Sequence, residues 1–206
     1  MKIKICGITR LEDAQLAVNL GADAIGFIFY DKSKRYINPQ NAKNIISELP
    51  SFIHKVGVFV NEKSEKINET AKFCGLTIIQ LHGDETPEFI DEINYSCIKA
   101  LRVDNIFNYD ILYRYKKTPI LLDSFNEKHY GGTGETFDWE NIPEKIKSKI
   151  ILAGGISEEN LEEIFTKIKP YAIDISSSVE DSPGVKNKIK MEKLFNKIKM
   201  SGNKLC

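Results

Sequence analysis

The sequence predicts an α/β protein that folds as a single-domain (β/α)8 barrel over residues 1–206. Short apolar runs alternate with amphipathic stretches from end to end, and eight such pairs can be counted. Strands that alternate with helices pair in parallel through right-handed crossovers, and eight units can close into a barrel. No proline-rich linker, low-complexity tract or change in composition divides the chain. An open doubly wound sheet is the alternative, but no Gly-x-Gly-x-x-Gly follows an early strand.

The first predicted unit covers the amino-terminal 21 residues. In Lys2–Cys6 polar and apolar residues alternate with the period of a strand. Thr9 followed by Glu12 three residues later predicts a capping box for a helix near Arg10–Leu20. Gly21 is expected to end that helix. Cys6 therefore sits where the first strand ends and the backbone turns.

The next three units follow the same scheme. Asn38 with Pro39, and Thr86 with Pro87, each read as a capping side chain followed by a first-turn proline. Asn61 is expected to open the helix between them, which runs to about residue 74. The three strands are predicted at Ala24–Phe29, Lys55–Val60 and Thr77–Leu81.

The last four units are predicted from shorter signals. Helices are expected over about 105–115, over 138–147 and from a capping Ser157 to about residue 169, and Val179–Glu180 is expected to begin a short extra helix. The glycine-rich segment Gly131–Gly134 is read as a mobile loop or a lid. A helical stripe of Met191, Leu194, Phe195 and Ile198 marks the last helix. The strands are predicted at Cys97–Val103, Pro119–Asp123, Ile150–Ala153 and Tyr171–Ile175.

Composition narrows the function classes. Lys and Arg together number 29, as do Asp and Glu, so no net field would recruit nucleic acid or an anionic membrane. No apolar run approaches the ~18 residues of a membrane span, and no secretory signal pattern is present. We expect a cytoplasmic protein without a disulfide framework or a metal site, because the cysteines and histidines are widely spaced. They are Cys6, Cys74, Cys97, Cys206, His54, His82 and His129.

Chemistry-bearing residues follow six of the eight predicted strands. In such a barrel the carboxyl ends of the strands share one rim, and that rim carries the chemistry. The shared position, more than any one residue type, predicts a functional site there. The rim residues are Cys6, Arg35, His82, Asp123, Gly154 with Gly155, and Asp174 to Ser178.

The last two strand ends predict a phosphate site. Gly154 and Gly155 offer bare backbone N–H groups, and Ser176, Ser177 and Ser178 add hydroxyl groups. Loops after the seventh and eighth strands are the usual phosphate-binding elements of these barrels. A Gly-Gly pair alone is more often only a turn, so the prediction rests on its combination with the serine run.

Four rim residues are candidates for other roles. A thiol at Cys6 can act as a base if its pKa is brought toward neutrality, although most free cysteines are small apolar fillers. Asp123 ends an apolar strand and suits a general acid, or simply caps a turn. Arg35 can clamp a carboxylate, or lie solvated in its loop. His82 is equally a structural histidine or a substrate contact.

The motifs together resemble one enzyme family, the phosphoribosylanthranilate isomerases of tryptophan biosynthesis. The resemblance runs in order from Lys4 to about Asn187 and covers seven segments. They are Lys4–Thr9, Ser33–Ile37, Val56–Val60, Gln80–Gly83, Gly131–Gly134 with Phe137–Trp139, Ala153–Gly155, and Asp174–Ser177 with Val179–Glu180 and Pro183–Lys186. Two positions depart from the family: Ser178 replaces a glycine, and Asn187 stands where aspartate is more usual.

The resemblance implies a (β/α)8, or TIM, barrel that catalyses an Amadori rearrangement without metal or cofactor. N-(5′-phosphoribosyl)anthranilate would become 1-(2-carboxyphenylamino)-1-deoxyribulose 5-phosphate. By analogy Asp123 is the general acid and Cys6 the general base, and Arg35 holds the anthranilate carboxylate. The remaining substrate-binding residues would be His82, Asp174 and the phosphate-binding Gly154, Gly155, Ser176 and Ser177. A monomer or a homodimer is expected.

Other sugar-phosphate barrels fit the residues less well. A ribulose-phosphate epimerase would need metal-binding histidines at several strand ends, and only His82 occupies such a position. An indole-glycerol-phosphate synthase would place a lysine acid on the rim, but no predicted strand ends on lysine. A non-catalytic phosphate-binding barrel would keep Gly154 and Ser176 without needing both Cys6 and Asp123.

Overall fold

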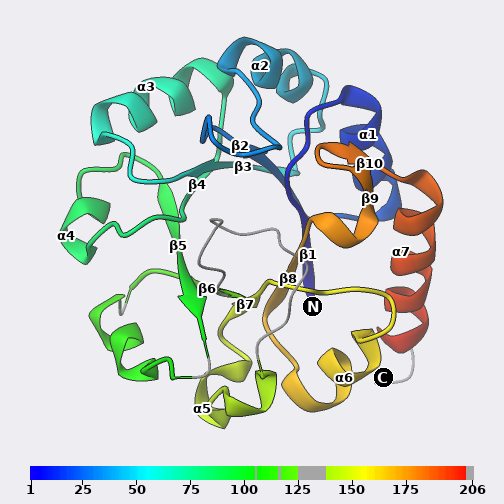
Figure 1. Ribbon diagram of the computed structural model, residues 1–206. Helices are drawn as coiled ribbons and strands as arrows, with labels where there is room; N and C mark the ends of the chain where they lie inside the picture. Colours follow the sequence, from blue (N-terminus) through cyan, green and yellow to red (C-terminus); the bar gives the residue numbers. More distant parts are fainter. Residues whose placement is uncertain (105, 116, 125–137, 203–206) are drawn as a thin grey trace.

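The computed structural model describes residues 1–104, 106–115, 117–124 and 138–202. Eight parallel strands form a closed barrel in chain order, and β8 pairs back onto β1. Figure 1 looks into the barrel, with the helices arranged around its outside. The predicted barrel is therefore confirmed. The strands are β1 (Lys2–Ile5), β2 (Ala24–Ile28), β3 (His54–Phe59), β4 (Ile78–Leu81), β5 (Ser96–Val103), β6 (Ile120–Ser124), β7 (Ile151–Leu152) and β8 (Ala172–Ile175).

Helical elements follow the strands, and several are short. No helix among the described residues combines the length and apolarity needed to cross a membrane. The α-helices are α1 (Leu11–Leu20), α2 (Pro39–Ser47), α3 (Ser64–Cys74), α4 (Pro87–Ile90), α5 (Glu144–Lys147), α6 (Leu161–Glu163) and α7 (Lys188–Gly202). The other helical turns are the 3-10 segments η1 (Tyr109–Tyr115), η2 (Trp139–Asn141) and η4 (Ser177–Val179), and the π-helix η3 (Ile164–Ile168).

Three predicted helix ends are confirmed. The Asn38 side chain accepts a hydrogen bond of 2.9 Å from the Asn41 N–H at the start of α2. Thr86 accepts one of 3.4 Å from Phe89 at the start of α4. Gly21 ends α1 at φ 109°, a left-handed conformation that glycine adopts without a steric penalty.

The predicted capping box at the start of α1 is wrong. Arg10 is the N-cap and makes no side-chain capping bond. The Thr9 hydroxyl instead donates to the Gly184 carbonyl, and Glu12 accepts hydrogen bonds from Arg10. A partner 175 residues away thus outcompetes the local cap, which a local pattern cannot reveal.

Two other helix starts also differ from the prediction. Asn61 does not open α3: it has φ 50° and donates its N–H to Glu85 over 2.8 Å, and the helix begins three residues later. Ser157 does not cap α6, because its own N–H donates to the Asn160 side chain over 2.9 Å. In both places the backbone N–H of the expected capping residue donates to the side chain of another residue, Glu85 or Asn160.

Two predicted helices have a different form, and one predicted segment is not described. The helix expected over 138–147 is split at Pro143 into η2 and α5, because proline disfavours helical backbone in the residue before it. The helix expected over 105–115 is 3-10 over Tyr109–Tyr115. The loop Gly131–Gly134 lies outside the described residues.

A small hairpin after β8 was not predicted. The short helix expected at Val179–Glu180 is the 3-10 turn η4, and the chain then forms β9 (Glu180–Ser182) and β10 (Val185–Lys186). These two strands pair antiparallel outside the barrel and lie beside α1 (Figure 1).

The barrel wall is lined by side chains that alternate between the helices and the interior. Ile5 is fully buried, whereas Lys4 and Cys6 lie on the other face of the same segment. Room for both comes from Gly26 on β2, where a Cβ atom would lie 2.8 Å from Cys6 Sγ and 3.1 Å from Lys4 Cε. The missing side chain of Gly26 thus makes space for the Cys6 thiol.

Substituting Gly26 tests this packing. Gly26→Ala should lower the free energy of unfolding by about 1–3 kcal/mol, as overpacking of a core does, and should displace the Cys6 sulfur. Combining it with Cys6→Ala, which removes the nearest atom, should reduce that cost. Urea unfolding measures both, and an unchanged free energy in the single variant would show that the space is not needed.

Candidate active site

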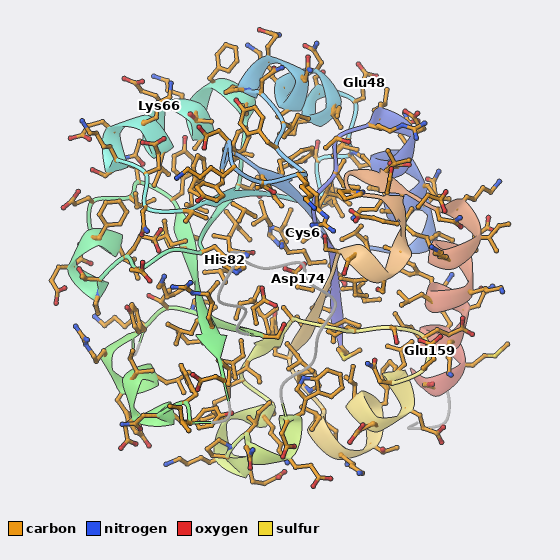
Figure 2. The ribbon with its side chains drawn as sticks, viewed as in Figure 1. Cys6, Glu48, Lys66, His82, Glu159 and Asp174 are labelled. Carbon is orange, nitrogen blue, oxygen red and sulfur yellow. The ribbon has the colours of Figure 1, made fainter. Side chains whose placement is uncertain are left out.

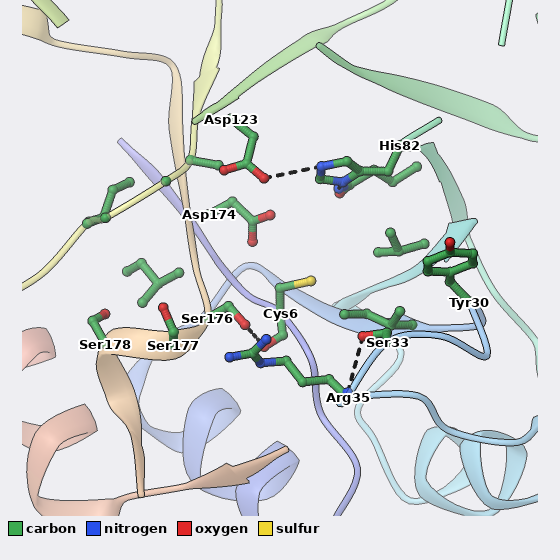
Figure 3. Close-up of a pocket in the computed structure, with 18 of the residues that line it drawn as sticks. Cys6, Tyr30, Ser33, Arg35, His82, Asp123, Asp174, Ser176, Ser177 and Ser178 are labelled. Atoms are coloured by element: carbon green, nitrogen blue, oxygen red, sulfur yellow. Dashed lines mark hydrogen bonds and ion pairs between the residues drawn. The ribbon is translucent and has the colours of Figure 1, made fainter. Parts of the chain in front are cut away.

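One pocket opens at the carboxyl-terminal rim of the barrel. Every residue predicted for the site lines it, although they come from strands and loops spread over the chain (Figures 2 and 3). The structure therefore brings together Cys6, Arg35, His82, Asp123, Gly154, Gly155, Asp174, Ser176 and Ser177.

Cys6 extends the pairing between the first and last strands. Its N–H donates to the Ile175 carbonyl over 2.8 Å, which sets the cysteine next to the end of β8. Burial raises the pKa of the Cys6 thiol, and the positive charge of Lys4 opposes that rise while Asp174 adds to it. The net shift is upward, so the thiol is protonated at neutral pH. The condition set for a base role, a Cys6 pKa brought toward neutrality, is therefore not met in this state.

Asp174 is held at the bottom of the pocket by a buried ion pair. Lys4 Nζ lies 2.7 Å from Asp174 Oδ2, and both side chains are less than a tenth exposed. Burial raises the pKa of Asp174 against the charge of Lys4, and the neighbouring Asp123 carboxylate raises it further. Among the described residues, Oδ1 of Asp174 has no hydrogen-bond partner. That oxygen is a buried acceptor on a residue that lines the same pocket as Cys6 (Figure 3).

Asp123 faces His82 across the pocket. The His82 Nε2 and Asp123 Oδ2 atoms are 3.2 Å apart, and Asp123 Oδ1 accepts the Ser124 N–H over 2.9 Å. Gln80 Nε2 lies 2.9 Å from His82 Nδ1. When the Gln80 amide donates there, the ring proton of His82 sits on Nε2 and points at Asp123. His82 is thus a partner of the candidate acid.

The glycine and serine turns meet at one side of the pocket. Gly154 has φ 83°, and a Cβ atom there would lie 2.7 Å from Ser124 N, so only glycine fits. Gly155 is also left-handed, at φ 64°. Ser176 donates its hydroxyl to the Cys6 carbonyl over 3.2 Å. Ser177 begins the tight turn η4, and the two turns form a cradle of backbone and hydroxyl groups.

Arg35 reaches into the pocket from the loop after β2. Its guanidinium pairs with Glu180 through Nε at 3.0 Å to each carboxylate oxygen and through Nη2 at 2.8 Å to Oε2. The Arg35 side chain is 12% exposed, so it is not the solvated loop residue of the alternative reading. A guanidinium has five N–H donors, which leaves its outer edge for a second anion.

Sequence reasoning missed four polar residues at the site. Lys4 and Gln80 lie two positions before Cys6 and His82 on the same strands, so strand alternation places each pair on the inner face. This two-residue alternation could therefore have identified Lys4 and Gln80 from the sequence. Glu180 and Lys186 lie in the unpredicted hairpin and were assigned no role.

The geometry supports acid–base chemistry on an anionic sugar. A thiol and a carboxyl group share one small pocket with an arginine and the glycine–serine cradle (Figure 3). The described residues include no group of three or more His, Cys, Asp or Glu side chains placed to hold a metal ion.

Comparisons with known proteins give one consistent family. A model of the N-(5′-phosphoribosyl)anthranilate (PRA) isomerase family matches residues 3–197. The N-(5′-phosphoribosyl)anthranilate isomerase of Geotalea uraniireducens is 47% identical over 199 residues, which cover 96% of this chain and 98% of that protein.

Solved structures agree with the sequence relatives. Phosphoribosyl anthranilate isomerase from Thermotoga maritima superposes with a TM-score of 0.89 at 41% identity, covering 97% of this chain and 99% of that one. A second Thermotoga maritima structure, of monomers generated from the dimeric enzyme, has a TM-score of 0.85 at 38% identity, covering 97% and 98%. A crystal structure of a phosphoribosyl anthranilate isomerase in complex with reduced 1-(o-carboxyphenylamino)-1-deoxyribulose 5-phosphate has a TM-score of 0.84 at 39% identity, covering 97% of this chain and 99% of that one. The chain belongs to the N-(5′-phosphoribosyl)anthranilate isomerase family.

Proposed function

We propose that this protein isomerises N-(5′-phosphoribosyl)anthranilate to 1-(2-carboxyphenylamino)-1-deoxyribulose 5-phosphate in tryptophan biosynthesis. Family membership supports the reaction. The single observation that carries the residue roles is the convergence of Cys6, Asp123 and Arg35 on one pocket with the glycine–serine cradle. The reaction needs one acid and one base across a sugar, with an anion-binding group at each end.

Asp123 acts first as the general acid. It gives its proton to the ribose ring oxygen, the bond between that oxygen and C1′ breaks, and the anthranilate nitrogen lone pair forms the iminium. His82, 3.2 Å from Asp123, supports the carboxylate that remains. The thiolate of Cys6 then takes the proton from C2′, and the electrons of that C–H bond neutralise the iminium to give an enolamine.

The enolamine gives the product by tautomerisation. The C2′ hydroxyl loses its proton and C1′ gains one, so substrate and product have the same atoms and no redox partner takes part. The Lys4 ammonium beside Cys6 favours the thiolate, whereas burial and Asp174 oppose it. The active thiolate is therefore a minor form at neutral pH. Because turnover also needs the proton on Asp123, the rate should depend on pH as a bell-shaped curve.

The two anionic ends of the substrate orient its reacting centre. Arg35 holds the anthranilate carboxylate on its outer edge, and Gly154, Gly155, Ser176 and Ser177 hold the phosphate. Neither anion reacts, so their binding energy serves to place C2′ by the thiol and the ring oxygen by the acid. Asp174 is a further substrate contact through its unpartnered oxygen, which suits a sugar hydroxyl donor.

The remaining properties are proposals of the same kind. We propose one barrel domain over residues 1–206 that works in the cytoplasm as a monomer or homodimer, without cofactor, nucleic acid or membrane. The three described cysteines are buried and unpaired, which fits a reducing compartment. Light scattering of the purified protein tests the assembly, and a stable assembly larger than a dimer would contradict it.

Removing the acid or the base tests the mechanism. Cys6→Ala and Asp123→Asn should each lower kcat by about two to four orders of magnitude, the usual contribution of a positioned acid or base. The loss of phosphoribosylanthranilate fluorescence measures turnover, and circular dichroism verifies folding. Near-parental turnover in either folded variant would refute that residue's role.

Removing the guanidinium tests the carboxylate clamp. Arg35→Ala should mainly raise KM or misplace the substrate, because the lost contact is to a group that does not react. Steady-state kinetics in the same fluorescence assay measures the change. Kinetics identical to those of the parent would show that Arg35 binds no part of the substrate.

The raised pKa of Cys6 predicts slow alkylation. The iodoacetamide rate at Cys6, followed by peptide mass spectrometry, should be lower at pH 7.5 than in the urea-unfolded chain. Thiolate is the reactive form, and the folded pKa lies above the ordinary value of 9.0. The rate should rise as the pH passes 9. A rate that is already maximal near pH 7 would contradict this environment.

A further inference from the structure

A buried carboxylate in the β9–β10 hairpin holds two basic side chains, one of which, Arg35, lines the pocket. Glu180 makes the two-point pair with Arg35 and also accepts from Lys186 Nζ over 2.8 Å. The Glu180 side chain is 3% exposed and the Lys186 side chain 0%. Although burial alone would raise the pKa of Glu180, hydrogen bonds from Arg35 and the charge of Lys186 bring it below its usual value. Glu180 is thus ionised at neutral pH.

Lys186 connects this carboxylate to the reacting end of the site. Its Nζ donates to the Cys6 carbonyl over 2.6 Å and to the Ser176 carbonyl over 3.1 Å, in addition to Glu180. Those carbonyls lie just beyond β1 and β8, where the candidate base and the phosphate cradle begin. The β9–β10 hairpin therefore contacts Arg35, the backbone at Cys6 and the backbone at Ser176.

The charges in this cluster do not cancel. Burial lowers the pKa of Lys186 against the charge of Glu180, but its Nζ donates three hydrogen bonds, which needs the ammonium form. With one carboxylate and two cations, the Arg35–Glu180–Lys186 cluster carries one net positive charge. Pairing through Nε and Nη2 fixes the plane of the guanidinium, because two parallel hydrogen bonds remove its rotation about the long side chain. Arg35 is therefore held in one orientation before an anion arrives, and within the described part of the chain its only side-chain hydrogen bonds are those to Glu180.

We propose that Glu180 is a positioning residue that acts through Arg35 to make the site selective for a substrate carboxylate. The inference rests on the proposed function and deepens it. Glu180 itself touches no substrate. It fixes the direction of the guanidinium, so that the carboxylate of the aryl amine meets a pre-oriented two-point donor and does not have to order a flexible side chain.

A pair of ligands that differ only in the carboxylate tests this role. The first is 1-(2-carboxyphenylamino)-1-deoxyribitol 5-phosphate, and the second is its phenylamino counterpart without the carboxylate. Glu180→Gln should weaken binding of the carboxylated ligand about tenfold, which is the effect of losing one charged contact. It should weaken binding of the ligand without the carboxylate less than about twofold. Calorimetry gives both Kd values. Equal weakening of the two ligands, or no weakening of the first, overturns the proposal.

A neighbouring acid provides a matched control. Asp181 is the next residue in the hairpin, and its hydrogen bond runs to the Asn187 side chain over 2.7 Å, away from Arg35. Asp181→Asn removes the same charge and should leave both Kd values unchanged. In an Arg35→Ala background, Glu180→Gln should no longer alter the ratio of the two Kd values. A persistent change in that background also overturns the proposal.

Two further measurements keep the test decisive. If Glu180→Gln does not fold, Glu180→Asp retains the charge for Lys186 but is too short for the two-point pair, and the same ligand-selective loss is expected. Turnover of N-(5′-phosphoribosyl)anthranilate by the parent protein is measured separately. Absent turnover would refute the proposed function, whereas turnover with non-selective Glu180 variants would refute only the positioning role.

Discussion

The closure of the barrel between β1 and β8 is the constraint on which the site depends. In this register Lys4 pairs with Asp174 and Ile5 with Ile175, and the Cys6 N–H then continues the ladder onto β8. The buried Lys4–Asp174 ion pair spans this seam. A shift of one residue would turn Lys4 and Cys6 out of the barrel, because strand side chains alternate. Closure thus places a thiol from the start of the chain beside the phosphate cradle near its end.

The charges and the burial in the pocket act in opposite directions on the ionisation of the Cys6 thiol. Two buried cations, Lys4 and Lys186, lie near Cys6 and favour its thiolate, while burial and Asp174 favour the thiol. The outcome is a protonated Cys6 at rest. A base with a raised pKa is a stronger proton acceptor once ionised, so the cost in thiolate population is partly offset by a more favourable proton transfer from C2′.

Much of this arrangement could be predicted from the sequence, for a physical reason. Carboxyl ends of parallel strands converge on one rim, so nine residues found at such ends line one pocket. The errors lie where distant partners override local patterns, as when Thr9 binds Gly184 instead of capping α1. The same holds for Glu180 and Lys186, whose hairpin has no periodic signal and whose partners lie up to 180 residues away. Their charges could be read from the sequence, but their burial could not.

The most direct test of the central claim is a crystal structure with the reduced product, 1-(2-carboxyphenylamino)-1-deoxyribitol 5-phosphate, bound. The account predicts the Cys6 sulfur against C2′, Asp123 within hydrogen-bond distance of the oxygen that closes the ribose ring, and the carboxylate on the outer edge of Arg35. The phosphate should lie between the Gly154 and Ser176 turns. A ligand bound in the reverse direction, or with C2′ out of reach of Cys6, would contradict the account.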